Sequence, residues 1–338
     1  MKRVVIIGGG LAGTACAYVL KQAGAEPVIY EAGAELAPGA SGNPVGLYNP
    51  RLSAFRTPES DFYAGAFALA LRVFEGLNDI DWNPCGALHL MTDEKRQKRF
   101  EQAAQSWGWP PENMRLLNAG EASEVAGIEI KYDALYLPQS GTVSPKKLCE
   151  RYAQGVEVHL NKKIDDIAEL KADAVIVAGG MGVKDFFDLP LKAVRGQITQ
   201  AKPTEISKRL KCCLCYGGYV TPVSGNVHTV GATFQRWLDH SDVMPQDDAD
   251  NIKALAAVVP ELAQGMEVTG GRAALRTTAP DHFPVVGKLK DNVYVSTAHG
   301  SHGILSALAA AHLLADMILG RPLSLPGDVV GRLSPGRF

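Results

Sequence analysis

The glycine-rich segment GGGLAG at positions 8–13 constrains the fold more than any other feature of the sequence. Residues 4–7 form an apolar run before it, which is typical of a buried parallel strand. Apolar side chains then recur at helical spacing over residues 11–20, and residues 27–30 form a second apolar run that ends at Glu31. The order of strand, glycine turn, helix, strand and acid predicts the first βαβ unit of a Rossmann-type sheet.

Each glycine of this segment has a separate physical role. Gly8 permits a tight turn, Gly10 lets the backbone approach a pyrophosphate, and Gly13 lets the helix lie close to the strand. The free N–H groups and the helix dipole favour a bound anion, and Glu31 is placed to bind ribose hydroxyls. The pattern predicts a dinucleotide site, and the motif alone does not distinguish NAD from FAD. No second copy of the motif follows, whereas a flavoprotein that also uses NADPH often carries two.

Two later segments have the same α/β character as the first unit. Residues 171–182, KADAVIVAGGMG, contain a short apolar strand before Ala-Gly-Gly, which suits a strand returning beside the first one. Residues 291–320 predict a strand, a turn of glycine, histidine and serine, and a long helix that ends at Gly320. Both segments extend the predicted nucleotide-binding sheet.

The intervening residues have a different pattern. Residues 51–135 contain aromatic and helical stretches, residues 195–235 predict strands with a hairpin turn at VSGN, and residues 247–262 predict a helix with an acidic start. We therefore predict an α/β fold (α+β overall), in which a Rossmann-type nucleotide-binding domain is interleaved with an antiparallel-sheet substrate domain. The predicted division assigns residues 1–50, 136–194 and 271–338 to the first domain and residues 51–135 and 195–270 to the second.

Composition and charge narrow the class of protein. The net charge of the 338 residues is −2, so any nucleic-acid contact needs a local basic patch. No apolar run approaches the length of a membrane span, and the N-terminus is interpreted as a strand, which predicts a cytoplasmic protein without a membrane partner. The six cysteines are scattered, and we interpret Cys212 to Cys215 as part of a buried strand and predict no metal site.

Characteristic segments occur along nearly the whole chain, namely IIGGGLAG, AVIVAGG, VRGQI, GGYVTPVSG, ALRTTAPDHFPVVG and NVYVSTAHGSHGILSA. In this order they resemble the D-amino-acid oxidase family of flavoproteins, which includes glycine oxidase and sarcosine oxidase. A narrower set consists of GASGNPVGLYNPRLS, FYAGAFALALRVFEGL, CGALHLMTDEKR and the run Asp-His-x-Pro-x-Val-Gly. This set resembles the FAD-dependent half of MnmC, the bifunctional tRNA 5-methylaminomethyl-2-thiouridine biosynthesis family.

The family resemblance implies a Rossmann-type FAD-binding domain and noncovalent FAD, because no cysteine or histidine matches a covalent flavin link. Residues 299–304 precede a helix, and the N-terminal amides of this helix would face the flavin pyrimidine. Alternatively, His299 and His302 only cap the helix. The FAD-binding residues that the resemblance implies are Gly8, Gly10, Leu11, Ala12, Gly13, Glu31, Ala40, Ser41, Gly46, Leu47, Ile164, Ala178, Gly179, His299, Gly300, Ser301, His302, Gly303 and Ile304.

Two residues are expected to act on the substrate. Arg276 aligns with the arginine that clamps a substrate carboxylate in the family, and its planar fork suits that task. Tyr219 lies where the family places a tyrosine that faces the flavin, and it is either a substrate hydrogen-bond donor or a packed aromatic. Arg272 lies outside the match, and we expect it to pair with a protein acid. Asp281 and Pro284 are expected to shape the turn beside the flavin, and His282 is interpreted as a loop histidine.

The narrower resemblance implies oxidation of the carboxymethylaminomethyl group of a tRNA wobble uridine. The chain starts at the FAD motif, so methylation is expected to need a separate methyltransferase. The basic run Lys95, Arg96, Lys98 and Arg99 is either a solvated helix face or a phosphate contact. The alternatives are a small-molecule amine oxidase and a non-enzymatic flavin scaffold. Further basic residues that could join this run if the fold brings them together are Lys146, Lys147, Lys162, Lys163, Lys208, Arg209 and Lys211.

Overall fold

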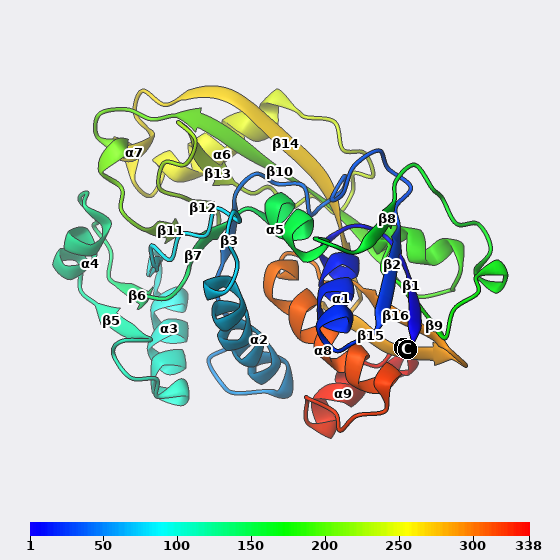
Figure 1. Cartoon of the computed structure of the whole chain (residues 1–338). Helices are drawn as coiled ribbons and strands as arrows, with labels where there is room; N and C mark the ends of the chain where they lie inside the picture. Colours follow the sequence, from blue (N-terminus) through cyan, green and yellow to red (C-terminus); the bar gives the residue numbers. More distant parts are fainter.

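The computed structural model describes residues 1–338 and contains two principal sheets (Figure 1). The first sheet has six strands in the order β15-β16-β9-β1-β2-β8, and every neighbouring pair is parallel except β15 with β16. Its strands are β1 (Arg3–Ile7), β2 (Glu26–Tyr30), β8 (Glu157–His159), β9 (Ala174–Val177), β15 (Val285–Lys290) and β16 (Val293–Thr297). The predicted βαβ unit at the N-terminus and the returning strand at β9 are confirmed.

Helices α1 (Leu11–Gln22) and α8 (Gly303–Leu319) pack against each other on one face of this sheet (Figure 1). Their apolar faces belong to the largest core cluster, in which Leu20 and Leu308 are fully buried. Helix α8 ends as predicted at Gly320, whose φ of 67° is the left-handed conformation that glycine adopts without strain.

The second sheet has eight strands in the order β14-β10-β13-β12-β11-β4-β6-β5. It is antiparallel except for the pair β4 and β11, and its long pair β10–β14 runs over the nucleotide-binding half (Figure 1). The hairpin turn predicted at VSGN is confirmed, since Gly225 and Asn226 both have positive φ between the bridged residues Ser224 and Val227. The strands are β4 (Ala87–Leu90), β5 (Arg115–Leu117), β6 (Ala134–Leu137), β10 (Lys192–Lys202), β11 (Cys213–Cys215), β12 (Tyr219–Val220), β13 (His228–Gly231) and β14 (Glu267–Thr278).

The elements of the two halves are interlocked. The predicted boundaries after residues 194 and 270 fall inside β10 and β14, because these long strands leave the nucleotide-binding half and continue into the second sheet. Helix α2, which the predicted division assigns to the substrate domain, packs against α8 and α9 in the nucleotide-binding core. The remaining elements are α2 (Pro58–Glu75), α3 (Glu94–Trp107), α4 (Ala119–Ala126), α5 (Pro145–Tyr152), α6 (Pro245–Ala256), α7 (Pro260–Ala263), α9 (Gly327–Leu333) and the pair β3 (Gly46–Tyr48) and β7 (Gly141–Val143).

The cysteines are all free, and the predicted buried strand at Cys212–Cys215 is present as β11. Burial raises the pKa of the Cys212 thiol above its ordinary value, as expected for a cysteine that acts as a small apolar side chain. Cys213 contacts Cys85 on the adjacent segment, with 3.8 Å between the two sulfur atoms. No helix of the chain combines the length and the apolar composition that crossing a membrane requires.

Candidate functional site

A large cavity of about 610 Å³ lies where the carboxyl ends of the parallel strands meet β12 and β14 of the second sheet. This edge is where open α/β sheets bind their ligands. The cavity is lined by Arg276, by Tyr219 and by every residue that the resemblance assigns to FAD except Gly13. The structure thus brings these residues together from eight segments of the chain, while their individual contacts with FAD stay a prediction.

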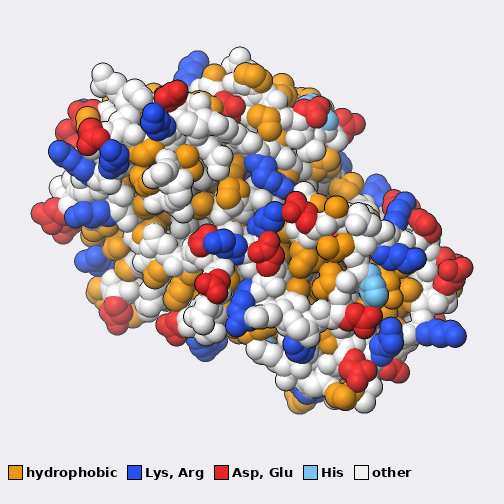
Figure 2. All heavy atoms as spheres, turned by 45° about the horizontal axis from the view of Figure 1, so that its top comes forward, with side chains coloured by type: hydrophobic (Ala, Val, Ile, Leu, Met, Phe, Trp, Pro, Cys, Tyr) orange, Lys and Arg blue, Asp and Glu red, His pale blue; other side chains and the backbone are white.

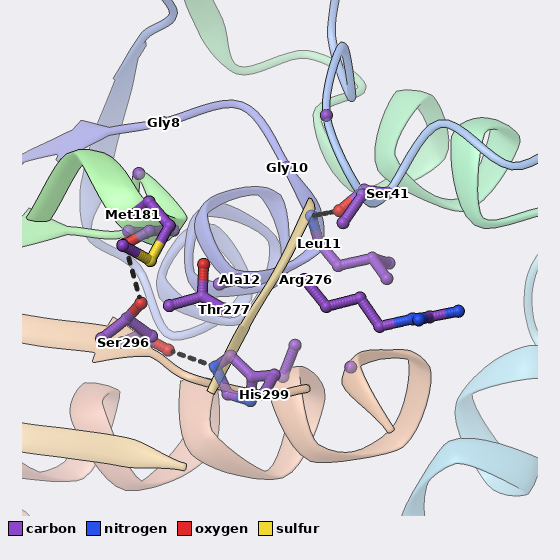
Figure 3. A pocket seen from close by; sticks show the side chains of 18 of the residues that line it. Gly8, Gly10, Leu11, Ala12, Ser41, Met181, Arg276, Thr277, Ser296 and His299 are labelled. Atoms are coloured by element: carbon purple, nitrogen blue, oxygen red, sulfur yellow. Dashed lines mark hydrogen bonds between the residues drawn. The ribbon is translucent and has the colours of Figure 1, made fainter. Parts of the chain in front are cut away.

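The glycine turn after β1 forms one side of the cavity (Figure 3). Gly8 has φ of 113°, and a Cβ there would lie 2.7 Å from the carbonyl oxygen of Ala178. A Cβ on Gly13 would lie 1.9 Å from the oxygen of Gly8, so only glycine lets the helix lie this close to the turn. Gly13 itself does not line the cavity. No side chain caps α1 at Gly10, and Ser41 Oγ accepts only the N–H of Leu11 at 3.0 Å. The remaining first-turn N–H groups are therefore available to an anion.

Glu31 closes the same side of the cavity with a buried carboxylate. Its Oε2 accepts the N–H of Gly9 at 2.6 Å, and its Oε1 accepts the N–H of Gly33 at 2.7 Å. The sequence predicts that this acid binds ribose, and the structure adds that it also fixes the two glycine segments beside the cavity. Each carboxylate oxygen retains a second acceptor site.

We expect Glu31→Gln to raise the dissociation constant for FAD about 10-fold or more, because an amide cannot accept from both glycines and leaves one buried N–H unpaired. The measurement is a titration of the FAD-free protein with FAD, followed by flavin fluorescence. Glu35→Gln is the matched control, since exposed Glu35 pairs with Lys146 at 2.7 Å outside the cavity. Equal affinities for the two variants would contradict the role given to Glu31.

The segment before α8 forms the opposite side of the cavity (Figure 3). Ser306 Oγ donates to the carbonyl of His302 at 3.0 Å, so it accepts the Nδ1–H of His299 at 2.9 Å, and His299 Nε2 accepts from Ser296 at 3.1 Å. Burial lowers the pKa of His299 to about 4, which keeps the ring neutral at neutral pH. Neither histidine side chain caps α8, so the first amides of this helix also remain available to an anion.

Arg276 lines the cavity from β14, with its side chain directed away from the glycine turn (Figure 3). Its guanidinium donates to the carbonyl of Thr233 at 3.3 Å and lies 5.9 Å from the ring centroid of Phe234. The guanidinium has no carboxylate within 4 Å. Burial lowers its pKa, but the group stays charged because arginine is not deprotonated in proteins. A Cβ on Gly196 would lie 1.9 Å from Nη1, so this glycine makes room for the guanidinium.

Tyr219 reaches the same cavity from β12. Burial raises the pKa of its phenol to about 12, partly offset by the charge of Arg276, so the hydroxyl is protonated at neutral pH. The hydroxyl forms no hydrogen bond with the protein and is free to donate to a ligand. Arg276 and Tyr219 together offer one unpaired cation and one unpaired hydroxyl at the same cavity wall.

Other predicted residues have structural partners. Arg272 was expected to pair with an acid, but it donates instead to the carbonyls of Pro38 and Gly39 and to Asn43 Oδ1, because this loop crosses directly over β14. Asp281 forms an ion pair with Arg337 at 2.8 Å, which ties the turn before β15 to the C-terminus.

His282 and Pro284 belong to the same turn. His282 is exposed with φ of 57°, and its carbonyl accepts from Arg51 at 3.1 Å. Pro284 is buried directly before β15. All three residues of this turn that the sequence singled out lie outside the large cavity, so their effect on the flavin would be indirect.

The sequence did not single out several residues that line the cavity. Met181 and Thr277 lie within the segments KADAVIVAGGMG and ALRTTAPDHFPVVG, so membership of a motif was their available signal. Asn49 lies within the segment GASGNPVGLYNPRLS, but its place in the cavity depends on how the segment after β3 meets the second sheet.

The basic residues do not form one continuous patch. Lys146, Lys147 and Lys208 are paired with Glu35, Asp81 and Glu205. Lys162 and Lys163 line the large cavity, away from the basic run of α3. Positive and negative side chains are interspersed over the face seen in Figure 2. Phosphate contact by the α3 run stays a prediction.

The comparison with protein families identifies the chain. The model of the family described as FAD dependent oxidoreductase (DAO) matches residues 3–317. The chain belongs to this family. Its cofactor is therefore FAD, and the chain is an FAD-dependent oxidoreductase. The site fits a cofactor that carries a pyrophosphate, a ribose and a flavin. It offers the glycine turn, the carboxylate of Glu31, and the N-termini of α1 and α8, which no side chain caps.

Curated relatives in this family are the tRNA 5-methylaminomethyl-2-thiouridine biosynthesis bifunctional proteins MnmC. The protein from Idiomarina loihiensis is 32% identical over 357 aligned positions, which cover 99% of this chain and 58% of the relative. The protein from Chromobacterium violaceum is 32% identical over 392 positions, which cover 100% of this chain and 59% of the relative. The chain thus spans a little more than half the length of these relatives.

Solved structures of the family share the fold. Glycine oxidase from Geobacillus kaustophilus superposes with a TM-score of 0.81 at 21% identity, over 100% of both chains. Iminodiacetate oxidase from Chelativorans sp. BNC1 superposes with a TM-score of 0.83 at 22% identity, over 98% of this chain and 99% of that one. The predicted interleaving of a Rossmann-type half with a mainly antiparallel sheet is the architecture of this fold.

Proposed function

We propose that the chain oxidises an N-substituted glycine unit, and that this unit is the 5-carboxymethylaminomethyl side chain of a wobble uridine, with or without 2-thiolation, in tRNA. The observation that carries the proposal is the unpaired guanidinium of Arg276 beside the free hydroxyl of Tyr219 at the wall of the FAD cavity. A half-buried guanidinium without an acid partner favours an anion from the ligand, and a carboxylate matches its two parallel N–H groups.

The clamp would fix the orientation of the reacting bond. A carboxylate held by Arg276 leaves the glycine α-carbon one bond away, so its C–H is positioned by the clamp. Bound FAD would accept the hydride and its electron pair from this carbon. The amine nitrogen loses its proton and forms a C=N bond, water adds to that carbon, and cleavage of the C–N bond releases glyoxylate and the aminomethyl-uridine.

The relatives favour tRNA as the carrier of this unit. The MnmC proteins are named for biosynthesis of a modified tRNA uridine, and they match this chain over almost its whole length at 32% identity. The amine product would then require methylation by a methyltransferase, on this protein or on a separate partner. A tRNA substrate would place the reaction in the cytoplasm.

A second candidate is oxidation of a free amino acid. The fold neighbours named glycine oxidase and iminodiacetate oxidase act, by their names, on small molecules that contain the same glycine unit. The carboxylate clamp would serve both kinds of substrate, so the candidates differ in what lies beyond the amine nitrogen.

The deciding experiment is anaerobic. The FAD-loaded protein is mixed with tRNA that carries 5-carboxymethylaminomethyl-uridine, and separately with glycine, sarcosine and D-alanine, while the flavin absorbance is followed. We expect bleaching by the modified tRNA and release of glyoxylate, and no bleaching by the same tRNA with unmodified uridine. Bleaching by a free amino acid alone would favour the second candidate. A flavin that none of these amines reduces would favour a scaffold.

A further inference from the structure

A second cavity of about 210 Å³ adjoins the large one. Asn49 and His302 line both cavities, so the two spaces meet at these side chains. The rest of its lining comes from residues 50–52, from β4, from α3 and from β6. A ligand that reacts in the large cavity can therefore extend past Asn49 and His302.

The strand register shows where the second cavity lies relative to the reacting end. His89 on β4 is paired with Cys215 on β11, and Cys215 is paired with Tyr219 on β12. Directly paired residues on neighbouring strands point to the same face of a sheet. Tyr219 and His89 thus lie on one face, two strand spacings of about 4.8 Å apart. A substrate with its carboxylate near Tyr219 and Arg276 would reach His89 along this face.

The second cavity offers polar groups that the protein does not satisfy. Asn49 Nδ2 donates to His89 Nε2 at 3.1 Å, which leaves the amide oxygen Oδ1 without a partner in the protein. The imidazole of His302 forms no hydrogen bond, and its ring lies 5.3 Å from that of Tyr63. Burial, together with the charges of Arg51 and Arg276, lowers the pKa of His302 to about 4, so it is neutral and carries one donor and one acceptor.

The walls and the rim have different chemistry. The walls include Phe100, Ala103 and Leu135, which suit a flat apolar surface. Arg51 and Arg99 are exposed at the rim. Arg51 donates to the carbonyl of His282 at 3.1 Å, and Arg99 donates weakly to that of Leu52 at 3.4 Å. Both guanidinium groups retain free N–H donors at the cavity rim. These donors could bind the phosphate groups that flank a nucleoside held in the cavity.

We propose that the second cavity binds the pyrimidine ring of the substrate, with Asn49 Oδ1 accepting the N3–H of uracil and His302 donating to an adjacent ring carbonyl. This inference rests on the proposed function, and it extends it by assigning the base a site. A cavity of this size suits one small ring, being smaller than a drug-sized pocket. Cytosine would present an acceptor at N3 to the Asn49 oxygen, so the site selects uracil by repulsion as well as by attraction.

The test uses the FAD-loaded protein and two probes, the nucleoside 5-carboxymethylaminomethyl-uridine and its N3-methyl derivative. Anaerobic flavin reduction at increasing probe concentration gives the apparent dissociation constant of each. We expect N3-methylation to weaken binding to the unchanged protein about 10-fold or more, because it leaves the Asn49 oxygen unpaired. We expect Asn49→Leu to abolish this difference between the probes, because the acceptor is gone.

A second pair of variants tests the cavity independently of Asn49. Ala103→Leu fills part of the second cavity, and we expect it to weaken binding of the nucleoside at least 10-fold. Ala104→Leu, the next residue of α3, lines neither cavity and is the matched control. The FAD content of every variant is measured first, so that loss of the cofactor is not mistaken for loss of the base site.

The outcomes separate this inference from the proposed function. If modified tRNA reduces the flavin of the unchanged protein, but N3-methylation has no effect or Ala103→Leu behaves like Ala104→Leu, the base site is overturned and the proposed function stands. If neither the modified tRNA nor the nucleoside reduces the flavin, the proposed function fails, and the base site fails with it.

Discussion

Replacing Arg276 with alanine is expected to lower kcat/KM for an N-substituted glycine by roughly 10²- to 10³-fold, which corresponds to about 3–4 kcal/mol. The guanidinium has no acid partner and shares its part of the cavity with Tyr219, and no other arginine lines this cavity to replace it as a planar carboxylate clamp. Anaerobic stopped-flow reduction of the flavin measures the effect, and the FAD content shows that the cofactor is retained. Arg276→Lys should recover only part of the loss, because an ammonium group lacks the planar fork.

A variant that leaves Arg276 in the sequence provides a sharper form of this prediction. Gly196→Ala places a Cβ 1.9 Å from Nη1 of Arg276, and the flexible end of the arginine can move away at little cost to the fold. We expect unchanged thermal stability but a weaker carboxylate clamp, seen as a higher KM. Arg272→Ala is the contrasting control on the same strand, because Arg272 holds the loop at Pro38 and Gly39 and its loss should weaken FAD binding. A Gly196→Ala variant with the KM of the unchanged protein would contradict the clamp.

Local sequence was sufficient to predict the nucleotide-binding half. The glycines at positions 8–13 have steric requirements that few other folds impose, and the apolar runs of β1, β2 and β9 are long enough to specify buried parallel strands. The division into domains was harder to place. Strands β10 and β14 are each continuous through a predicted boundary, and a strand pattern does not mark where one end leaves a core.

In the candidate site, too, some residues could be predicted from local sequence, whereas their contacts depend on the folded chain. Arg276 and Tyr219 could be named because a family motif surrounds each of them, yet the absence of an acid beside Arg276 is a property of the folded chain. Arg272 shows the opposite case, since nothing in its spacing from Arg276 indicates that its partners are the carbonyls of a distant loop. Asn49 and His89 belong to segments 40 residues apart, and only the register of β4 against β11 brings His89 into line with Tyr219.

A buried ion pair behind the site leads to the last prediction. Arg195 and Asp247 are almost completely buried, and Arg195 also donates to Gln235 Oε1, to Gln197 Oε1 and to the carbonyl of Asp242. The backbone of Arg195 is bridged to that of Gln235, two residues after Thr233, whose carbonyl accepts from Arg276. The pair therefore joins α6 to the segment that supports the carboxylate clamp.

Asp247→Ala is expected to lower the free energy of unfolding by about 3–5 kcal/mol, because Arg195 would remain buried without its carboxylate. Arg195 Nε is already buried without a hydrogen-bond partner, so the loss of Asp247 would leave a second unsatisfied donor on the same guanidinium. Thermal unfolding of the FAD-loaded protein measures the loss, which we expect as a fall in Tm of roughly 5–15 °C. Asp250→Ala is the matched control on α6, since Asp250 is exposed and accepts only from Gln246 at 2.9 Å.

The double variant Arg195→Met with Asp247→Leu separates loss of the pair from burial of an uncompensated charge. Because apolar side chains of similar volume require no desolvation of ions, this variant should recover much of the stability that Asp247→Ala loses. It should not recover the position of Gln235 and Thr233, because the guanidinium that joins them to α6 is gone. We therefore expect a restored Tm together with a raised KM for the N-substituted glycine. A Tm for Asp247→Ala equal to that of Asp250→Ala would contradict the stabilising role of the ion pair.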